Sequence, residues 1–343
     1  MKVTVIGASG YSGGELLRIL DSHPHFVVHG AIAHSQVGEL IASVHPHLLH
    51  HASRRFDGLD SALIDQAELI FLALPHGESG RLISEHHELF SHKKVVDLGA
   101  DFRLRSTASW ERYYGGKHFG TWQYGLPELP GFRDEIIKST KIANPGCYAT
   151  AISLALAPFA SISAEIDFAD IVITAASGTT GAGRSAKVNL IGSEVMNSLS
   201  AYKVGGIHQH TPEIEEALAQ LVKAEVALSF TPILAPMPRG ILASVSIPVA
   251  GSSIQDIRSA FEDLYAKEQF VHVLGQGQWP QTNSVLGSNA VHLQVAFDAH
   301  VERAVVIAAI DNLGKGAASQ AIQNANLISG IDEATGLSPT GVR

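Results

Sequence analysis

The stretch VTVIGASGYSGGELLRIL (residues 3–20) decides the fold class. It is a short apolar run ending in Gly7, then a turn containing Gly10 and Gly13, then an amphipathic helix pattern with leucines on one face. A tight turn needs residues without a Cβ, and the helix directs its unpaired N–H groups and positive dipole end toward that turn. Strand, G-x-x-G-x-x-G turn and helix together predict a pyrophosphate site for a dinucleotide, with a purely structural glycine turn as the alternative.

The second predicted strand, residues 26–34, bears on the choice of dinucleotide. Folds that prefer NAD usually place Asp or Glu about 20 residues after the turn, where it binds the ribose 2′-hydroxyl. Here the strand ends in Ala33, His34 and Ser35, without an acid. That leaves room for a 2′-phosphate, so we expect NADP(H) as the cofactor.

Further apolar runs, at residues 69–75, 94–99 and 141–146, are separated by helix-like stretches. Strands that are apolar throughout are buried on both faces, as in a parallel sheet with helical crossovers. We therefore expect an α/β protein in which residues 1–146 form a Rossmann-type NADP-binding domain.

The pattern changes at Cys147, where an Ala/Leu-rich helix begins. The strands that follow, at residues 170–178, 227–237 and 240–250, predict an open antiparallel sheet covered by helices. We expect residues 147–313 to form an α+β domain for catalysis and oligomerisation.

The last predicted helix follows a turn with Asn312, Gly314 and Gly316 and is apolar enough to dock. We expect it to return to the first domain, so that residues 314–343 belong there. The final eight residues, GLSPTGVR, contain turn and breaker residues, and we expect them to be loosely held.

Composition excludes several classes of protein. The 343 residues carry a net charge of −9 and no basic block, which argues against nucleic acid or an anionic membrane as a partner. No apolar run reaches the roughly 18 residues of a transmembrane helix, and the N-terminal residues enter a strand without a signal-peptide pattern. One cysteine cannot form an internal disulfide. We expect a soluble, cytoplasmic protein that acts on a small molecule.

That cysteine lies in Asn144-Pro145-Gly146-Cys147-Tyr148, between a predicted strand and a predicted helix. Amides at the helix start would stabilise a thiolate and lower the pKa of the thiol from its usual value of about 8.5. A thiolate beside a nicotinamide suggests thioester formation combined with hydride transfer. The alternative is a buried cysteine that acts as a small apolar side chain.

Histidines supply the candidate acid–base groups. If the backbone is extended, His208 and His210 point the same way, and an imidazole with a pKa near 7 is a natural partner for a thiol. The alternative, a metal pair, lacks an evident third ligand. Thr211, Pro212 and Glu213 fit an N-cap, a first-turn proline and an acid at the positive helix end, which would make Glu213 a helix-start residue.

A second histidine cluster fits a solvated loop better than a metal site, because no carboxylate or cysteine completes a ligand set; its members are His45, His47, His50 and His51. The glycine-rich segment 177–184 suits close contact with a ligand, and suits an ordinary surface loop equally well. Arg103 and Arg239 are candidates for bidentate binding of phosphate or carboxylate, with solvated side chains as the alternative.

These motifs occur in an order that resembles the N-acetyl-γ-glutamyl-phosphate reductase family of arginine biosynthesis, within the semialdehyde dehydrogenases. The resemblance extends to about residue 330 and rests on GASGYSGGELLRIL, LALPHG, DLGADFRL, NPGCYAT, SGTTGAGR, HQHTPEI, PMPRGI and DNLGKGAASQAIQN. NPGCYAT and HQHTPEI are specific together, whereas the glycine turn alone is not. Gln209 stands where the family often has arginine, which weakens any inference of a charge there.

The resemblance implies an oxidoreductase of the aldehyde group that reduces N-acetyl-L-glutamyl 5-phosphate to the 5-semialdehyde with NADPH, as a homodimer or homotetramer and without a metal. It implies Cys147 as the nucleophile and His208 as the acid–base group. The implied cofactor-binding residues are Gly7, Ser9, Gly10, Tyr11, Ser12, Gly13, Ser35, Leu74, Pro75, Ser177, Gly178 and Asn312. The implied substrate-binding residues are Arg103, Asn144, Arg184, His210, Glu213 and Arg239.

Other functions stay open on the residues alone. One is a reductase of a different acyl phosphate, of the aspartyl or aminoadipyl type. Another is a non-enzymatic NADP-binding sensor whose thiol is regulatory. A metal-dependent hydrolase is a weaker candidate, because the histidine pair lacks a third ligand.

Overall fold

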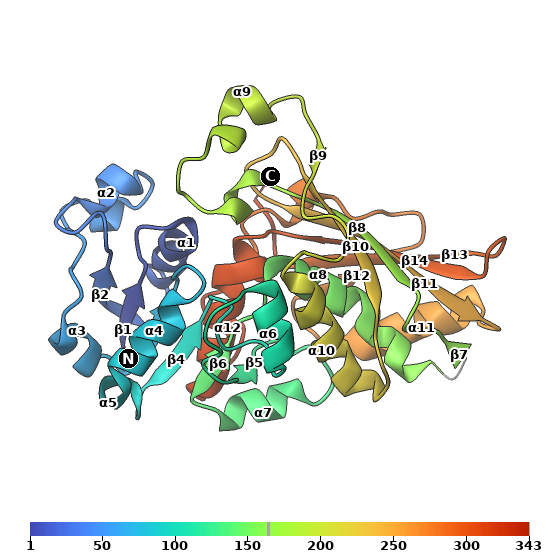
Figure 1. The fold of residues 1–343 in the computed structure, drawn as a ribbon, viewed down its shortest axis with the longest axis horizontal. Helices are drawn as coiled ribbons and strands as arrows, with labels where there is room; N and C mark the ends of the chain where they lie inside the picture. Colours follow the sequence, from blue (N-terminus) through green and yellow to red (C-terminus); the bar gives the residue numbers. More distant parts are fainter. Residues whose placement is uncertain (163–164, 343) are drawn as a thin grey trace. The chain divides into compact units, whose positions relative to one another are not determined.

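The structure is a computed structural model that describes residues 1–162 and 165–342 (Figure 1). The chain divides into two compact units. The first unit comprises Met1–Pro127, Gly131–Pro145 and Ala317–Leu337. The second comprises Glu128–Pro130, Gly146–Gly316 and the segment that begins at Ser338.

The first unit contains a six-stranded, all-parallel sheet in the order β2-β1-β3-β4-β6-β5. Its strands are β1 (Lys2–Ile6), β2 (Val27–Ile32), β3 (Leu69–Leu72), β4 (Lys94–Asp97), β5 (Gln123–Tyr124) and β6 (Lys141–Ala143). The apolar runs predict every strand except β5, a two-residue edge strand outside any such run. Leu69–Leu72 is buried at every position, which is why its sequence is apolar throughout.

Helices connect these strands, as parallel pairing requires. The connecting helices are α1 (Tyr11–Leu20), α2 (Ile41–Val44), α3 (Ser61–Asp65), α4 (Glu78–Glu85), α5 (His87–Phe90), α6 (Thr107–Tyr113) and α7 (Phe132–Lys138), and α12 (Ser319–Ile328) joins this unit from the end of the chain. Leu16 and Leu17 of α1 are fully buried, so the amphipathic pattern of this helix faces the core. The last helix, α12, packs on α7 and β4 within this unit.

The second unit is built on an eight-stranded sheet in the order β12-β13-β14-β11-β8-β10-β9, with β7 paired to β11. Its strands are β7 (Glu165–Ile166), β8 (Ile171–Ser177), β9 (Ser200–Ala201), β10 (Leu228–Leu234), β11 (Ile241–Ala250), β12 (Val271–Val273), β13 (Val291–Asp298) and β14 (Arg303–Ile310). The expected antiparallel arrangement is wrong for two pairs, because β8–β10 and β12–β13 are parallel. The sheet is mixed because helical segments connect those two pairs.

Helices cover one face of this sheet. They are α8 (Cys147–Leu156), α10 (His210–Val222) and α11 (Ile254–Tyr265), while the short α9 (Gly192–Val195) lies in a separate segment. Strand β11 alternates buried and exposed residues, and α8, buried along nearly its whole length, packs on β11 and β14. Pro158 lies just after α8, in a 3₁₀ turn, where it stops the α-helix.

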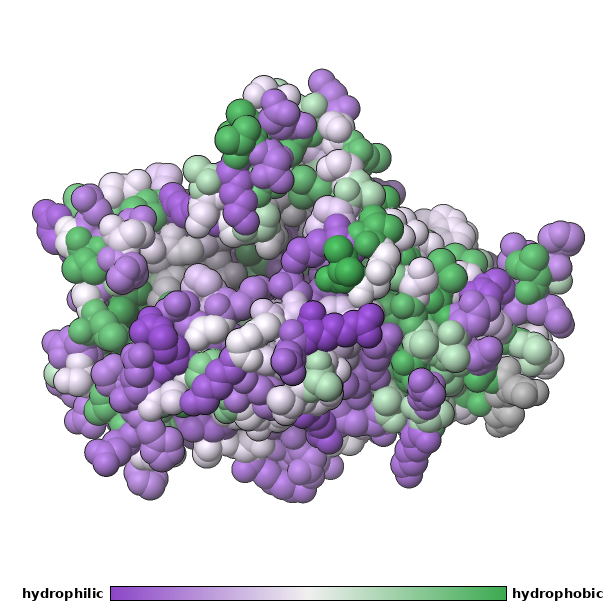
Figure 2. Space-filling model, in the orientation of Figure 1, coloured by the Kyte–Doolittle hydropathy of each residue, from purple (hydrophilic) through white to green (hydrophobic). Residues whose placement is uncertain are grey.

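The segment of residues 183–207, here called the arm, includes α9 and also β9, which pairs with β10; the part around α9 stands away from the strands in Figure 1. It exposes several large apolar side chains, and Figure 2 shows apolar and polar side chains mixed on it. The most exposed are Val188, Met196, Leu199 and Ile207.

The tail is more firmly held than the sequence predicts. The backbone N–H of Asn289 donates to the Ser338 carbonyl oxygen at 2.8 Å, and the Val342 N–H donates to the Leu286 carbonyl oxygen at 2.7 Å. These bonds lie in the second unit, so the predicted boundary that assigned all of 314–343 to the first domain is wrong for the tail. In the part of the chain described, no helix is both long and apolar enough to cross a membrane.

Candidate active site

The glycine turn after β1 is shaped by contacts that exclude side chains. Gly7 has a φ of +89°, and its N–H donates to the Ile32 carbonyl oxygen at 2.9 Å. A Cβ on Gly7 would lie 2.3 Å from the Ala73 carbonyl oxygen, and one on Gly13 would lie 2.3 Å from the Gly7 carbonyl oxygen. Because α1 begins at Tyr11, directly after this turn, its N-terminal amides face the turn, and the cradle fits a pyrophosphate.

The side chain of His45 packs against this turn. The expectation that His45 is solvated is therefore wrong. Its side chain is buried, and Nε2 donates to the Ala8 carbonyl oxygen at 3.0 Å. A Cβ on Gly14 would lie 2.4 Å from Cε1 of His45, so the ring occupies space that only a glycine leaves.

Two other members of this histidine cluster, His50 and His51, lie near the carboxylate of Asp21. His50 Nδ1 is 2.7 Å from Asp21 Oδ2, and His51 Nε2 is 3.6 Å from Asp21 Oδ1. Burial lowers the pKa of His51. Over residues 1–162 and 165–342, no group of three or more His, Cys, Asp or Glu side chains is arranged to hold a metal ion.

The end of β2 holds an acid that the sequence search missed. Ser35 is exposed and donates to Gln36 Oε1 at 2.7 Å. Asp57, far beyond the expected 20-residue spacing, pairs with the strand end, and its Oδ2 accepts the Ala31 N–H at 2.8 Å. Arg54 also lies 3.5 Å from that oxygen, so this carboxylate is already engaged by the protein.

Two other predicted cofactor contacts follow β3. Leu74 is half-buried and packs against the core cluster that contains Leu72, whereas Pro75 is exposed. Both lie at the carboxyl end of a parallel strand, as does the glycine turn, and ligands of open α/β sheets bind at this edge.

The predicted substrate residues of the first unit are held by backbone groups. Arg103 is 8% exposed, and it donates through Nε to the Asn144 carbonyl oxygen and through Nη2 to the Leu98 carbonyl oxygen, each at 2.8 Å. Asn144 donates to the Ala317 carbonyl oxygen and accepts from Asn324 Nδ2. Both side chains therefore brace the carboxyl end of this sheet.

Asp97, at the end of β4, is a buried carboxyl group that the sequence analysis did not single out. Oδ1 accepts from Ser79 Oγ at 2.7 Å and from the Gly99 N–H at 2.9 Å, while Oδ2 has no hydrogen-bond partner among the described residues. Burial, with a smaller contribution from the neighbouring Asp101 carboxylate, raises the pKa of Asp97 to about 7 against the opposing hydrogen bond from Ser79. The expected signal, a lone aspartate after an apolar run, is too common to identify such a group.

Cys147 is the first residue of α8 and is half-buried. The N-cap residue Gly146 has extended backbone, and its N–H donates to Glu213 Oε1 at 2.7 Å. Glu213 is 1% exposed. It therefore does more than begin its own helix, because its carboxylate ties α10 to the start of the helix that carries the cysteine.

The two histidines of HQHTPEI lie close together, although the extended backbone expected between them is wrong. Gln209 is helical, with φ −63° and ψ −20°, and α10 begins at His210, so Thr211 is not the N-cap. The His208 and His210 ring centroids are 4.9 Å apart. His208 Nδ1 accepts the His210 N–H at 3.1 Å, which leaves the ring proton on Nε2 when His208 is neutral.

Burial lowers the pKa of His208 to about 2, with further contributions from His210 and Lys203, while Glu213 opposes the shift. The value near 7 expected of a thiol partner therefore does not apply to this ring. His208 is a neutral hydrogen-bond donor at neutral pH.

Two tyrosines and a lysine surround this histidine, and sequence analysis missed all three. The Tyr148 and Tyr202 rings lie 5.4 Å and 5.8 Å from the His208 ring, and Tyr202 donates to Tyr148 Oη at 3.1 Å. Burial, with a smaller contribution from Cys147, raises the pKa of Tyr202 to about 12, and burial also raises the pKa of Tyr148. Lys203, which donates to Gln209 Oε1, adds a cation to this group.

The remaining predicted residues lie in loops at one end of the second sheet, where Ile241 pairs with both Ser177 and Ile310. Asn312 is buried; it accepts the Gly240 N–H at 2.7 Å and donates to Thr180 Oγ1 at 3.0 Å, which joins three loops.

Glycine also governs how these loops approach each other. A Cβ on Gly178 would lie 2.7 Å from the Pro238 carbonyl oxygen. Ser177, beside it, is buried, whereas Arg184 at the other end of this loop is exposed. The loop therefore has a fixed base and a solvent-facing end.

Arg239 forms a two-point ion pair with a buried acid. Its Nε lies 3.0 Å from Asp311 Oδ1 and its Nη2 lies 2.8 Å from Asp311 Oδ2. Asp311 itself is fully buried. The two residues occur in the motifs PMPRGI and DNLGKG, but they are 72 positions apart, so no local sequence pattern predicts that they pair.

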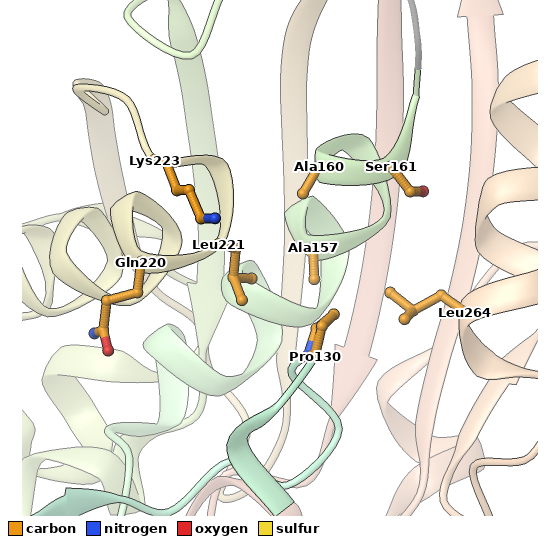
Figure 3. A pocket seen from close by; sticks show the side chains of 8 residues that line it. All are labelled: Pro130, Ala157, Ala160, Ser161, Gln220, Leu221, Lys223 and Leu264. Atoms are coloured by element: carbon orange, nitrogen blue, oxygen red, sulfur yellow. The ribbon is translucent and has the colours of Figure 1, made fainter.

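A pocket of about 360 Å³ lies elsewhere in the second unit, among α10, α11 and the turn after α8 (Figure 3). Its lining contains none of the predicted site residues. It is formed by Pro130, Ala157, Ala160, Ser161, Gln220, Leu221, Lys223 and Leu264.

Family models match both parts of the chain. Residues 2–139 match the semialdehyde dehydrogenase NAD-binding domain, and residues 147–312 match the semialdehyde dehydrogenase dimerisation domain.

Solved structures with this fold include an aspartate semialdehyde dehydrogenase with NADP from Candida albicans, at a TM-score of 0.68 and 16% identity over 96% of this chain and 98% of that one. Aspartate semialdehyde dehydrogenase II from Vibrio cholerae matches equally, at a TM-score of 0.68 and 17% identity over the same shares. These likenesses establish the fold.

Curated relatives are far more similar in sequence. An N-acetyl-γ-glutamyl-phosphate reductase of Acidothermus cellulolyticus is 57% identical over 99% of this chain and 98% of its own length. The reductases of that name from Salinispora arenicola and Salinispora tropica are 50% and 51% identical over 100% of this chain and 99% of theirs. This chain therefore belongs to the N-acetyl-γ-glutamyl-phosphate reductase family of the semialdehyde dehydrogenases.

Proposed function

We propose that this protein catalyses the NADPH-dependent reductive dephosphorylation of N-acetyl-L-glutamyl 5-phosphate to N-acetyl-L-glutamate 5-semialdehyde and phosphate, in L-arginine biosynthesis. The observation that carries the proposal is the position of Cys147, half-buried at the N-terminus of α8 and directly before Tyr148, whose ring lies 5.4 Å from the His208 ring. Full-length relatives at about half identity and above carry the name of this activity.

We assign NADP(H) to the first unit, residues 1–146 with the returning helix α12. The fit test is the glycine turn: side chains on Gly7 or Gly13 would collide with backbone, and the helix after the turn directs its amides toward an anion. When bound, NADPH supplies a hydride to the acyl carbon. In this unit the residues that would hold it are Gly7, Ser9, Gly10, Tyr11, Ser12, Gly13, Ser35, Leu74 and Pro75. Cofactor contacts by Ser177, Gly178 and Asn312 stay predictions from the family resemblance.

We assign the chemistry to the second unit, residues 147–313. The Cys147 thiolate attacks the acyl phosphate carbon, the C–O bond to phosphate breaks, and a thioester forms. After reduction, the C–S bond of the thiohemiacetal breaks, which releases the aldehyde and regenerates the thiolate. Amides at the start of α8 and the Nε2–H of neutral His208 donate hydrogen bonds to the oxyanion.

The substrate has two anionic ends, a carboxylate and a phosphate, and we propose cationic and polar side chains for them. Arg103 and Arg239 present fork-shaped donors, although each already contacts acceptors of the protein, so they act from fixed positions. Arg184 is exposed and can approach a ligand from its loop. Asn144, His210 and Glu213 complete the proposed set, Glu213 by holding Gly146.

We propose that the protein works as a homodimer or homotetramer in the cytoplasm. Exposed apolar side chains on the arm, together with Val172 and Leu242 on the uncovered face of the sheet, support association through the second unit. A reducing compartment would keep the single cysteine as a thiol.

The decisive experiment follows the reverse reaction. Purified protein is mixed with NADP, phosphate and N-acetylglutamate semialdehyde, and absorbance of the reduced nicotinamide is recorded. Phosphate-dependent reduction of NADP supports the proposal. Faster reduction with aspartate semialdehyde would assign a different acyl phosphate, and binding of NADP without turnover on any semialdehyde would favour a sensor.

A further inference from the structure

The turn that precedes α12 contacts the cysteine directly. Residues Gly314–Ala318 form a π-helical turn, and a Cβ built on Gly316 would lie 2.8 Å from the Cys147 Cβ and 3.3 Å from its Cα. Real Cβ atoms essentially never approach that closely, so a side chain on Gly316 would displace the cysteine or the turn. π-Helical turns are rare and occur frequently at functional sites.

Buried Asp311 holds the first half of this turn. Its Oδ1 accepts the N–H groups of Leu313 and Gly314 at 2.9 Å and 3.1 Å, and its backbone carbonyl accepts the Gly316 N–H at 2.9 Å. A Cβ on Gly314 would lie 2.3 Å from the Ser288 carbonyl oxygen, so this side of the turn is packed against backbone. The hydrogen bonds to Asp311 and the packing of Gly314 therefore fix the position of Gly316 from the residues that precede it.

A buried ion pair holds the residue next to Gly316. Lys315 Nζ lies 2.5 Å from Glu128 Oε1, and both side chains are 0% exposed. The ammonium also lies 5.7 Å from the centre of the Phe270 ring. Burying two charges costs desolvation that their attraction often fails to offset, so such a pair is weak evidence for stability and has best-attested roles in specifying geometry.

We propose that Gly316 and the Lys315–Glu128 ion pair are positioning residues for Cys147. The ion pair and Asp311 hold the π-helical turn, and the bare Cα of Gly316 then bounds the space in which the thiol sits at the start of α8. The proposal rests on the proposed nucleophilic role of Cys147, and it assigns these residues no contact with substrate.

The test compares Gly316→Ala with Gly192→Ala. Gly192 lies in the same unit, and a Cβ there would meet nothing within 4 Å among the described residues. Because the chain has one cysteine, alkylation by iodoacetamide reports on Cys147 alone. The readouts are the pH profile of alkylation, kcat and KM for NADPH-dependent turnover, and the thermal midpoint.

For Gly316→Ala we expect a displaced alkylation profile and a fall in kcat of about 100-fold, the size of effect that a 1 Å misplacement produces. The KM for NADPH should match that of Gly192→Ala, which itself behaves like the unmodified protein. The thermal midpoint should fall because the collision is buried, so kcat is compared per folded protein. An alkylation profile and kcat equal to those of the control would overturn the proposal, as would losses that only follow the unfolded fraction.

A second variant covers the case in which Gly316→Ala does not fold. Lys315→Met combined with Glu128→Leu replaces the ion pair by apolar groups of similar size, a change that buried pairs often tolerate. A folded double variant with a displaced alkylation profile supports the proposal, and one with an unchanged profile and kcat rejects the role of the pair. Alkylation needs no substrate, so a failure of the proposed reaction would leave this readout intact.

Discussion

The turns after β1 and after β6 are nearly the same local structure. Each leads from a parallel strand to a helix, and each helix has a glycine N-cap with extended backbone: Gly10 with φ −74° and ψ 172°, and Gly146 with φ −70° and ψ 150°. Both helix starts suit a negative charge, a pyrophosphate in the first case and a thiolate in the second.

The two turns differ in what completes them. The first is closed by nearby backbone, since Gly13 packs on Gly7 and Gly10 donates to Gly7 at 3.1 Å. The second is completed from far along the chain, by Glu213, 67 residues after Gly146, and by Gly316, which packs on Cys147. The first turn also contacts the distant residues Ile32, Ala73 and His45, but its glycines contact one another as well, whereas Glu213 and Gly316 both reach the second turn from far along the chain.

Replacing the nucleophile should have the largest effect. For Cys147→Ala we expect NADPH-dependent turnover to fall by at least about 10³-fold, because the covalent path is removed. The affinity for NADPH, measured by fluorescence titration, should stay within about twofold, since the first turn is untouched. If the variant turned over nearly as fast as the unmodified protein, the proposed nucleophilic role of Cys147 would be contradicted.

The packing of the first turn can be tested with a pair of glycine variants. Gly7→Ala combines a positive φ with a backbone collision, and we expect it to lower the free energy of unfolding by about 2–4 kcal/mol and to abolish NADPH binding. Gly10→Ala, with an ordinary φ and a contact of 3.5 Å, should cost less than about 1 kcal/mol. Urea unfolding measures both, and equal losses would show that the collision at Gly7 is relieved by local movement.

The dependence of the second turn on Glu213 can be tested with two substitutions. Glu213→Leu leaves the Gly146 N–H without its acceptor, and we expect kcat to fall by about 10- to 100-fold, in line with a loss of about 1–3 kcal/mol for an unpaired buried group. Glu213→Gln keeps an acceptor oxygen and should retain most of kcat.

The same pair of variants separates geometry from charge. Loss of a nearby negative charge favours the thiolate, so alkylation of Cys147 in Glu213→Gln should extend to lower pH than in the unmodified protein. Equal kcat values for the Leu and Gln variants would contradict the hydrogen-bonding role.

A further expected effect is a pH dependence of stability that belongs to the first region. Burial raises the pKa of Asp97 to about 7 from 3.8, so the folded state binds its proton more tightly than the unfolded state. Stability should therefore decrease as pH rises from about 4 to about 7 and change little from this group above that range.

Asp97→Asn keeps an acceptor for Ser79 and should flatten that slope. The midpoints of urea unfolding of the unmodified protein and of Asp97→Asn, measured at pH 5 and pH 8, check this expectation. The NADPH-dependent activity, which depends on Cys147, serves as the internal reference. A slope unchanged by the substitution would mean that other groups produce it.

Much of the fold follows from local patterns. Apolar runs such as 69–75 and the amphipathic pattern of α1 predict a parallel sheet with helices, because burial on both faces requires apolar side chains at successive positions. The mixed character of the second sheet was not predictable in this way, since β8 and β11 show the same alternation whether their neighbours run parallel or antiparallel. The edge strand β5 is too short to carry a pattern at all.

The residues of the candidate site likewise fall into those that the sequence could predict and those that it could not. Cys147, His208 and the glycine turn were identifiable because each residue type limits the chemistry it can perform. Tyr202, Lys203 and Asp311 were not, because tyrosine, lysine and aspartate are common and their significance comes from burial and from neighbours distant in sequence.

The amino-acid sequence alone determined that the N-termini of α1 and α8 suit a negative charge, because glycine spacing and helix polarity are properties of neighbouring residues. Tertiary structure decided which groups surround the sulfur, and whether the neighbouring imidazole is charged. A pKa depends on burial and on charges a few ångströms away, and these distances exist only once remote segments have packed together.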